Sequence, residues 1–366
     1  IFIIFNKLVC KTITLNIKNK TKITEIEKRI KVFAEIGYLL NQYFSNVNTE
    51  WIDQLKLKVN EASNKNPWFT KDNIDLSLKY WSQELTTNKL QSWLSGYKFF
   101  DAKPNTIAVI MAGNIPLVGF HDLLCVLITG NKLVIKFSND DDVLMRFIIK
   151  FLIFKNPNFK DCIIITDAII KDFDKVIATG SNNTSRYFDF YFRDKPSIIR
   201  KNRFSVAVLS GKENKIELEK LSNDIFSFFG LGCRNVSKIF VPNNYNFDEF
   251  FKSIYKWRKI LQNHRYASNY NYNRAINLID IQPILENGFL ILKESKNNHS
   301  PISVLLYEYY SDSSDLKNKI ELIKDDLQCI VSKDYCKNEI SFGETQNPKL
   351  YDFADNLDTI EFLLTK

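Results

Sequence analysis

The strongest constraint in the sequence is an alternation between residues 104 and 210, where short β-branched runs are separated by longer stretches of helical periodicity. Each run has the length of one buried strand, and each intervening stretch is long enough for a helix that crosses over a sheet. This rhythm predicts a parallel sheet with helices on both faces. The predicted strands are TIAVIMA, KLVIKF, CIIIT, KVIAT, SIIR and SVAVL.

Three turns that follow predicted strands carry small or polar residues, namely AGNIP, KFS and ATGSN. In an open parallel sheet, ligands bind outside the carboxyl ends of the strands, where free backbone N–H groups can meet an anion or an oxyanion. The pattern GxGxxG, which marks many dinucleotide-binding sheets, is missing after the first strand. A cofactor site at these turns would therefore be of another kind.

The chain has 366 residues, more than one ordinary hydrophobic core needs, so at least two domains are expected. Helical periodicity dominates the first hundred residues, a second strand-and-helix rhythm begins near 211, and the aromatic, acidic tail favours packing against the body. We expect a helical N-terminal region (1–100), a nucleotide-type α/β domain (101–210), a second α/β domain (211–340) and a C-terminal segment that packs back (341–366).

Finer elements follow from local signals. Ser138 is placed to cap a helix that runs through Phe154. The second half predicts helices over 215–229, 247–261 and 316–327, with an Asn/Tyr-rich polar loop after the second of these. Its predicted strands are NVSKIFVP, GFLILK and ISVLLYEYY.

Charge and cysteine usage exclude several classes of protein. The net charge is +8, but the lysines are scattered and no block of five basic residues occurs, so we expect a solvated surface and no nucleic acid partner. The apolar opening IFIIFNKLV is shorter than the roughly 20 residues of a membrane span, which predicts no span. Six cysteines without a CxxC pair predict neither a metal site nor a disulfide framework, and favour a reducing cytoplasm.

One cysteine lies in a setting unlike the others. In FGLGCRNVSKIF, Cys233 stands between a glycine turn and a predicted buried strand. Taken alone, this stretch suits a small core residue as well as a nucleophile, because a thiol can serve as either. The other five cysteines lie in apolar runs or outside any motif, which favours core positions.

Four motifs in order decide between these interpretations. MAGNIPLVGFHDLLCVLITGNKLVIKFS, ATGS and FGLGCRNVSKIFVP occur in the order and spacing of the aldehyde dehydrogenase superfamily. With SPISVLLYEYY and the closing FGETQNPKLYDFADNLDT, the chain more narrowly resembles the acyl-CoA reductases related to the fatty-acid reductase subunit of bacterial luminescence. The resemblance, from about residue 75 to the end, implies a Rossmann-type cofactor domain and a second α/β catalytic domain that carries the cysteine. The helical N-terminal region that periodicity predicts would precede them.

The resemblance implies two catalytic residues. Cys233 matches the nucleophile that forms an acyl-enzyme thioester, and Asn114 matches the asparagine whose side-chain amide helps to hold the oxyanion. From the residues alone, Asn114 could equally be a turn residue with an Asx hydrogen bond.

The resemblance also implies cofactor contacts. Lys136 and Ser138 follow the second strand, where the superfamily contacts the adenosine ribose, and Gly180 and Ser181 match the turn beneath the nicotinamide and diphosphate. Members that use the unphosphorylated cofactor usually carry a glutamate after the lysine, which KFSND lacks. NADPH is therefore favoured, although the nearby Asp140 keeps NADH open.

Two further features bear on the reaction. No acidic residue occurs between Arg203 and Lys212, where hydrolytic relatives carry the glutamate that activates water, so the resemblance favours reduction of a thioester. His264 is a candidate proton donor or substrate contact, although a surface histidine explains it as well.

The sequence thus predicts an enzyme that reduces a long-chain acyl-CoA, or another acyl thioester such as an acyl-protein, to the fatty aldehyde. The alternatives are a cysteine thioesterase or acyltransferase without redox chemistry, and a non-catalytic subunit that carries an acyl group. A homo-oligomer and an acylating partner subunit both stay open.

Overall fold

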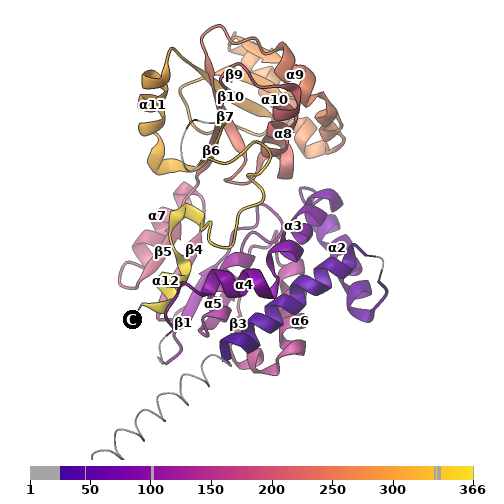
Figure 1. Cartoon of the computed structure of the whole chain (residues 1–366), viewed down its shortest axis with the longest axis vertical. Helices are drawn as coiled ribbons and strands as arrows, with labels where there is room; N and C mark the ends of the chain where they lie inside the picture. The colour runs from indigo at the N-terminus through magenta and orange to yellow at the C-terminus, as the bar shows by residue number, and fades with distance from the viewer. Residues whose placement is uncertain (1–24, 46, 100–102, 334, 336–338, 366) are drawn as a thin grey trace, which may run out of the picture.

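The computed structural model describes residues 25–45, 47–99, 103–333, 335 and 339–365, so the apolar opening of the chain lies outside the described residues. The described chain forms two α/β units, each built around its own sheet, which lie one above the other in Figure 1. No helix in this part of the chain combines the length and the hydropathy that a membrane span needs.

In the described chain, the first sheet has five parallel strands in the order β3-β2-β1-β4-β5. The order reverses between β1 and β4, and open α/β sheets bind ligands at such a switch point, outside the carboxyl ends of the strands. Helices cover both faces of the sheet, which explains the runs of Val, Ile and Ala. The strands are β1 (Thr106–Ile110), β2 (Lys132–Lys136), β3 (Ile163–Ile165), β4 (Lys175–Thr179) and β5 (Ser197–Arg200).

Threonine side chains begin three of the helices around this sheet. Thr49, Thr70 and Thr86 each accept a hydrogen bond from the backbone N–H three residues later, which satisfies a donor that the helix leaves unpaired. The helices of this unit are a first helix over 25–43, α2 (Glu50–Lys65), α3 (Lys71–Glu84), α4 (Thr87–Leu94), α5 (Phe120–Ile128), α6 (Val143–Lys155), α7 (Asn182–Tyr191) and α12 (Thr359–Leu364).

The predicted cap at Ser138 is wrong. The helix α6 begins only at Val143, and Ser138 instead accepts a hydrogen bond from the N–H of Asp140 within a turn. That turn also pairs the N–H of Asp141 with the carbonyl of Ser138, so the chain bends before the helix begins.

The second sheet, among the described residues, has the order β11-β6-β7-β10-β9-β8 and is parallel except for the pair β8–β9. The sequence pattern predicted that the strand β6 belongs to the first sheet. It pairs instead with β7 and β11, so it belongs to the second sheet. The strands are β6 (Phe204–Val208), β7 (Val236–Pro242), β8 (Ile284–Glu286), β9 (Ile291–Glu294), β10 (Val304–Tyr310) and β11 (Leu327–Val331), and the α-helices are α8 (Lys215–Phe226), α9 (Asp248–Ile254), α10 (His264–Ile279) and α11 (Ser313–Glu321).

The predicted Asn/Tyr-rich loop is in fact the helix α10. Asn263 caps it by accepting hydrogen bonds from the backbone N–H groups of the next residues, and Tyr266 and Tyr270 bury their rings one turn apart. The asparagines made this segment look like a loop, but at least one of them stabilises the fold. Asn273 is buried, and its side-chain amide donates to the carbonyl of Ile302. The predicted helix over 316–327 is also too long, since Leu327 begins the strand β11.

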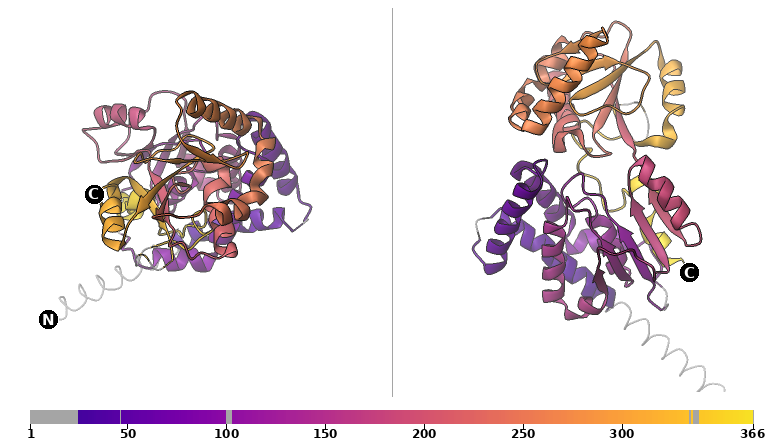
Figure 2. Two further views of the ribbon diagram at one scale, coloured as in Figure 1. Left: turned by 90° about the horizontal axis from the view of Figure 1, so that it is seen from above. Right: turned by 180° about the vertical axis from the view of Figure 1, so that it is seen from behind.

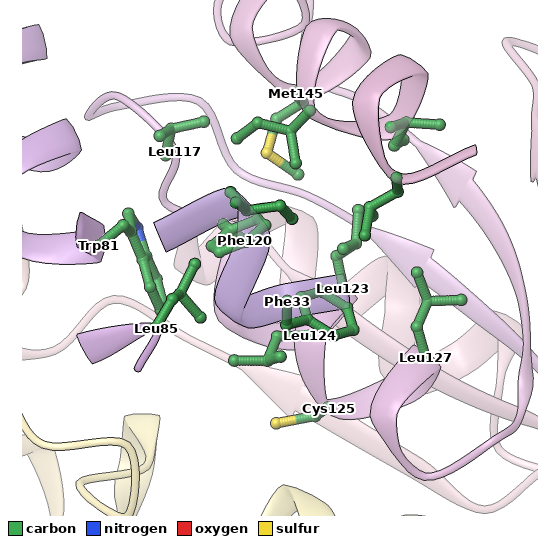
Figure 3. Packing of buried hydrophobic residues seen from close by; sticks show 14 of the residues in the cluster. Phe33, Trp81, Leu85, Leu117, Phe120, Leu123, Leu124, Cys125, Leu127 and Met145 are labelled. Carbon is green, nitrogen blue, oxygen red and sulfur yellow. The ribbon is translucent and has the colours of Figure 1, made fainter. Parts of the chain in front are cut away.

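The N-terminal helices and the first sheet share one hydrophobic core. Phe33 of the first helix, Trp81 of α3 and Phe120 of α5 are all buried in it, and the last two meet edge to face with ring centroids 4.5 Å apart. Figure 3 shows these side chains converging on α5. The helices before the sheet therefore complete the first unit.

The C-terminal segment crosses from the second unit back to the first, as Figures 1 and 2 show. At its far end, Lys175 of β4 donates hydrogen bonds to the carbonyls of Phe362 (2.7 Å) and Thr365 (2.6 Å). At its near end, the carboxylate of Asp224 on α8 accepts from the backbone N–H groups of Gly343 and Thr345. The segment is thus hydrogen-bonded to both units.

Replacing Leu124 by Ala is expected to lower the free energy of unfolding by about 2–5 kcal/mol, because the side chain is fully buried on α5 and its loss leaves a cavity. Leu57→Ala on α2 is the matched control, since that leucine is 67% exposed and should change stability by no more than about 0.5 kcal/mol. Urea denaturation of both variants measures the difference, and equal effects would contradict this description of the core.

Candidate active site

A cavity of about 670 Å³ lies between the two units. One side of the cavity is the carboxyl edge of the first sheet. There, Met111 directly follows β1, Thr179 ends β4 and Arg200 ends β5. On the other side are the first residues of second-sheet strands, including Phe204 of β6 and Val304 of β10. The switch point of the first sheet therefore opens directly onto the second unit.

The structure brings four of the predicted site residues together at this cavity. Asn114, Gly180, Ser181 and Cys233 all line it, although they come from three distant segments of the chain. Lys136 and Ser138 are not among its lining residues, because they lie at the end of β2, one strand beyond the switch point.

Three hydrogen bonds fix the loop that carries Cys233. The side-chain amide of Asn114 donates to the carbonyl of Leu231 (2.7 Å), and the Ser205 hydroxyl donates to the carbonyl of Cys233 itself (2.9 Å). The N–H of Gly232 donates to the side chain of Asn235 (2.8 Å). The first sheet, β6 and the start of β7 thus each hold one peptide of the loop.

Asn235 is the buried anchor of this loop. Only 2% of it is exposed, and its amide nitrogen donates to the carbonyls of Asp224 (3.0 Å) and Ser227 (2.9 Å) at the end of α8. Because the same side chain accepts from Gly232, it ties the helix to the loop on both sides of the turn.

The turn before the loop has a strained backbone. Phe228 and Phe229 have φ of 53° and 59°, and Gly230 follows at 75°. The left-handed region costs a non-glycine residue roughly 1–2 kcal/mol. The surroundings hold it there: Asn73 accepts from the N–H of Phe228, and the Phe229 ring packs on Trp68 with centroids 5.3 Å apart. Such strain is typical of sites whose geometry the fold enforces.

The Cys233 thiol is open to the cavity, yet the surrounding protein replaces much of the bulk water around it. This desolvation raises the pKa of Cys233 to about 11, while the adjacent Arg234 guanidinium acts to lower it. The Arg234 side chain is held by Cys329 Sγ (3.3 Å) and by the carbonyl of Asp352 (3.1 Å). At neutral pH the thiol is therefore protonated, and nucleophilic attack requires a group that accepts its proton.

Gly180 and Ser181 form a turn at the amino end of α7. Ser181 caps the helix by accepting from the N–H of Thr184 (3.2 Å), and the N–H of Gly180 donates to the carbonyl of Arg200 (3.2 Å). A Cβ added at Gly180 would lie only 3.0 Å from Thr184 and 3.1 Å from Phe188. The turn thus brings bare backbone to the cavity beside helix N–H groups that suit an anion.

The structure separates His264 from the other predicted residues. It is exposed at the first position of α10 and is not among the residues that line the cavity. A different histidine, His299, lines the cavity with its ring edge-to-face against Phe204, centroids 5.3 Å apart.

Sequence reasoning missed the charged groups of the cavity. Among the described lining residues, the acidic ones are Asp122 and Asp355. Asp122 pairs with Arg200 (2.5 Å), and Asp355 pairs with Arg203 (2.8 Å). Burial raises the pKa of Asp355, against the opposing effect of Arg203 and Arg200. Each pair joins segments far apart in the chain, so only the closing motif YDFADNLDT pointed toward Asp355.

The described residues include no group of three or more His, Cys, Asp or Glu side chains that could hold a metal ion. The four cysteines whose state is described, Cys125, Cys162, Cys233 and Cys329, are free thiols.

Comparison with known proteins gives a family and a fold. The family described as acyl-CoA reductase (LuxC) matches residues 24–261, which is well over half of the chain. No curated protein matches the sequence significantly.

Solved aldehyde dehydrogenases share the fold at low identity. An indole-3-acetaldehyde dehydrogenase complexed with NAD+ matches with a TM-score of 0.61 and 14% identity, over 84% of this chain and 72% of that one. An aldehyde dehydrogenase from Mycobacterium tuberculosis complexed with NAD+ gives 0.60 and 12%, over 84% and 73%. A glyceraldehyde-3-phosphate dehydrogenase from Methanocaldococcus jannaschii complexed with NADP gives 0.57 and 12%, over 86% and 77%. The predicted aldehyde-dehydrogenase-like fold is confirmed.

Iodoacetamide is expected to alkylate Cys233 slowly at neutral pH, with a rate that rises about tenfold per pH unit toward pH 11, because only the thiolate reacts. The denatured chain is the control, since an ordinary thiol pKa of about 8.5 should make the same peptide react roughly 10²-fold faster at pH 7. Peptide-resolved mass spectrometry follows the reaction. Fast native alkylation with a midpoint below pH 9 would contradict the desolvated thiol.

Asn235→Ala is expected to cost about 1–3 kcal/mol of unfolding free energy, because it leaves the N–H of Gly232 and two carbonyls without partners. Asn297→Ala, at an exposed position, serves as the control and should be within about 0.5 kcal/mol of the wild type. Chemical denaturation compares the three proteins. A variant as stable as the control would show that the buried amide does not anchor the loop.

Proposed function

Because the chain belongs to the LuxC family of acyl-CoA reductases, and is therefore an oxidoreductase with the aldehyde dehydrogenase fold, we propose that it reduces a long-chain acyl-CoA or related acyl thioester to the fatty aldehyde with NADPH. The reaction runs through an acyl group held covalently on Cys233. The main support for this proposal is that Cys233, Asn114 and the Gly180–Ser181 turn line one cavity between the two units.

The residues at the switch point fit a dinucleotide cofactor. The Gly180 backbone approaches α7 so closely that a Cβ there would lie only 3.0 Å from Thr184, and the residues at the start of this helix line the cavity. Gly180 and Ser181 would hold the diphosphate, and Lys136 and Ser138 at the end of β2 would hold the adenosine ribose. The bound nicotinamide would supply the hydride.

NADPH is the proposed form of the cofactor. The residues directly after Lys136 are Phe137 and Ser138, and neither carries the negative charge that would repel a 2′-phosphate. Three aspartates follow, of which Asp141 is buried and Asp142 pairs with Lys65 and Arg146. Asp140, two residues after Ser138, is the exposed one, and it leaves NADH as the second candidate.

The chain's own residues provide the covalent step. The Cys233 sulfur attacks the acyl carbonyl, and one amide N–H of Asn114 is already held by Leu231. The fixed amide leaves its second N–H for the oxyanion, so the donor does not have to reorganise when charge develops. Coenzyme A departs, and the remaining thioester accepts hydride and collapses to the aldehyde, which releases the thiolate of Cys233.

An apolar part of the cavity supports a long acyl chain as substrate. It is lined by side chains from the end of α8, the strained turn and α10, and all of them are buried. These residues are Ile225, Phe226, Phe229 and Tyr266, and they are joined by the buried Leu290, which directly precedes β9. Removing each CH₂ group of a chain from water into such surroundings contributes about 0.8 kcal/mol, which favours long chains over short ones.

The strand β6 supports reduction over hydrolysis. Its side chains from Phe204 to Val208 are apolar or hydroxylic, so this strand offers no carboxylate that could activate water against the thioester. An acyl-enzyme that water attacks slowly survives long enough to accept hydride.

Two alternatives stay open. A thioesterase or acyltransferase would release coenzyme A without any need for NADPH, and an acyl-carrying subunit would keep a stable acyl group on Cys233. A homo-oligomer or an acylating partner is compatible with each of the three functions, as is a reducing cytoplasm for the free thiols.

The test follows NADPH absorbance with a panel of acyl-CoA lengths while free coenzyme A and aldehyde are measured. We expect oxidation that is stoichiometric with aldehyde, and Cys233→Ser should lower the rate by at least about 10³-fold because a hydroxyl is a far weaker nucleophile. Cys162→Ser is the matched control, since this thiol lies beside β3 and outside the cavity.

Coenzyme A release that is independent of NADPH would favour the thioesterase. A stable acyl-Cys233 that NADPH leaves unchanged would favour the carrier. Either result would overturn the proposed reductase.

A further inference from the structure

We propose that Asp355, on the C-terminal segment, is the proton acceptor for the Cys233 thiol and returns that proton to the departing thiolate of the acyl donor. This inference rests on the proposed function, because it assigns the acid–base group of the same site. Two sheets supply the cavity, but a third part of the chain supplies this carboxylate.

Attack by Cys233 requires a proton acceptor in the cavity. The Cys233 thiol is protonated at neutral pH, and β6 carries no carboxylate. His264 lies outside the cavity, and Asp122, the other acidic residue among the described lining residues, is engaged by the buried Arg200 at 2.5 Å. His299 also lines the cavity, with its ring packed edge to face on Phe204. Asp355 lines the cavity too, and its charge acts on the Cys233 thiol, which makes it the carboxylate best placed to take the proton.

The geometry around Asp355 is specific. Its side chain is 8% exposed, and Arg203 contacts one of its oxygens, Oδ1, at 2.8 Å. Arg203 is itself fixed by the carbonyls of Asp325 and Leu327, and the N–H of Asp355 donates to Gln328 at 3.2 Å. The carboxylate is therefore held at the cavity wall by both its side chain and its backbone.

The backbone there is strained. Asp355 and Asn356 have φ of 60° and 57°, in the left-handed region that favours glycine. Two successive non-glycine residues in this conformation are costly, and such outliers cluster at functional sites because the surrounding structure imposes them. The strained residues are thus located where the C-terminal segment places Asp355 at the cavity.

Electrostatics couple the two groups. The negative charge of Asp355 acts to raise the pKa of Cys233, while Arg203 and Arg200 act to lower the pKa of Asp355 and Asp122 acts to raise it. Desolvation outweighs the arginines, so the pKa of Asp355 lies above its ordinary value. A carboxylate in this position is a stronger base than an exposed aspartate.

The proton balance of the step is closed. The S–H bond of Cys233 breaks as its sulfur bonds to the acyl carbon, and the proton moves to the Asp355 carboxylate. The bond from the acyl carbon to the donor's sulfur then breaks, and the leaving thiolate takes the proton from the Asp355 carboxylic acid. The carboxylate is restored, and no electrons are transferred.

The same base discriminates against water. The thiol has a pKa of about 11, whereas bulk water has about 15.7, so Asp355 faces a proton roughly 10⁴- to 10⁵-fold harder to remove from water than from Cys233. The pair with Arg203 restrains its basicity further. Asp355 is therefore a stronger base than an exposed aspartate, which suits the thiol, yet still a carboxylate that removes a proton from water inefficiently.

The test compares Asp355→Asn with Asp358→Asn. Asp358 lies in the same segment, hydrogen-bonds the Tyr97 hydroxyl at 2.7 Å and does not line the cavity, so it reports any general loosening of the segment. Rapid-quench measurement of coenzyme A release without NADPH gives the acylation rate from pH 5 to 9.

We expect Asp355→Asn to slow acylation by at least 10²-fold at pH 7 and to remove the acidic limb of the pH profile, with Asp358→Asn close to the wild type. Alkylation by iodoacetamide, which needs neither substrate nor cofactor, should change in the opposite direction. Loss of the negative charge lowers the pKa of Cys233, so alkylation becomes faster. A purely structural role for Asp355 does not predict these opposite changes.

An acylation rate for Asp355→Asn within threefold of the wild type, or an equal loss in Asp358→Asn, would overturn the assignment while the reductase stands. If the wild type oxidises no NADPH with any acyl-CoA, the proposed function fails instead. The alkylation profiles of the two variants then still decide whether Asp355 acts on the thiol.

Discussion

The site depends on one hydrogen bond between the two units, from the Asn114 amide to the carbonyl of Leu231. Such a bond contributes only about 1 kcal/mol of net stability. Its importance is positional, because it sets the carboxyl edge of the first sheet against the loop that carries Cys233. Asn235 and Ser205 hold the same loop from the second unit, so the loop of Cys233 is fixed from both sides of the cavity.

The features that could be predicted from the sequence are those that short stretches of residues encode. The β-branched runs identified the strands around the switch point, and the motif order placed Asn114 and Cys233 at one site. The helix α10 was missed because its asparagines and tyrosines read as a polar loop, although Tyr266 and Asn273 are buried. The sheet of β6 could not be predicted, since strand pairing joins it to the distant β11. The pair of Arg203 with Asp355 was hidden for the same reason, as it spans most of the second unit.

Desolvation has opposite consequences for the two acid–base groups of the cavity. Burial disfavours the charged form of both, which makes the Cys233 thiol a poorer acid and the Asp355 carboxylate a better base. The resting state therefore keeps a neutral thiol beside a charged carboxylate paired with Arg203. A neutral thiol is less open to oxidation, because oxidants attack the thiolate. In the proposed reaction, the thiolate then arises only when an acyl carbonyl can accept the electrons of the sulfur.

The C-terminal segment couples the assembly of the fold to the assembly of the site. Its helix α12 is held by Lys175 and by Arg200, which bonds Thr359 while it neutralises Asp122. Asp355 lies a few residues before that helix, so the same contacts that dock the segment place the carboxylate. Arg200 is thus a contact that the docked segment shares with the buried Asp122 of α5, because one guanidinium bonds both. A chain whose segment has not docked thus lacks Asp355, the proposed proton acceptor, as well as one wall of the cavity.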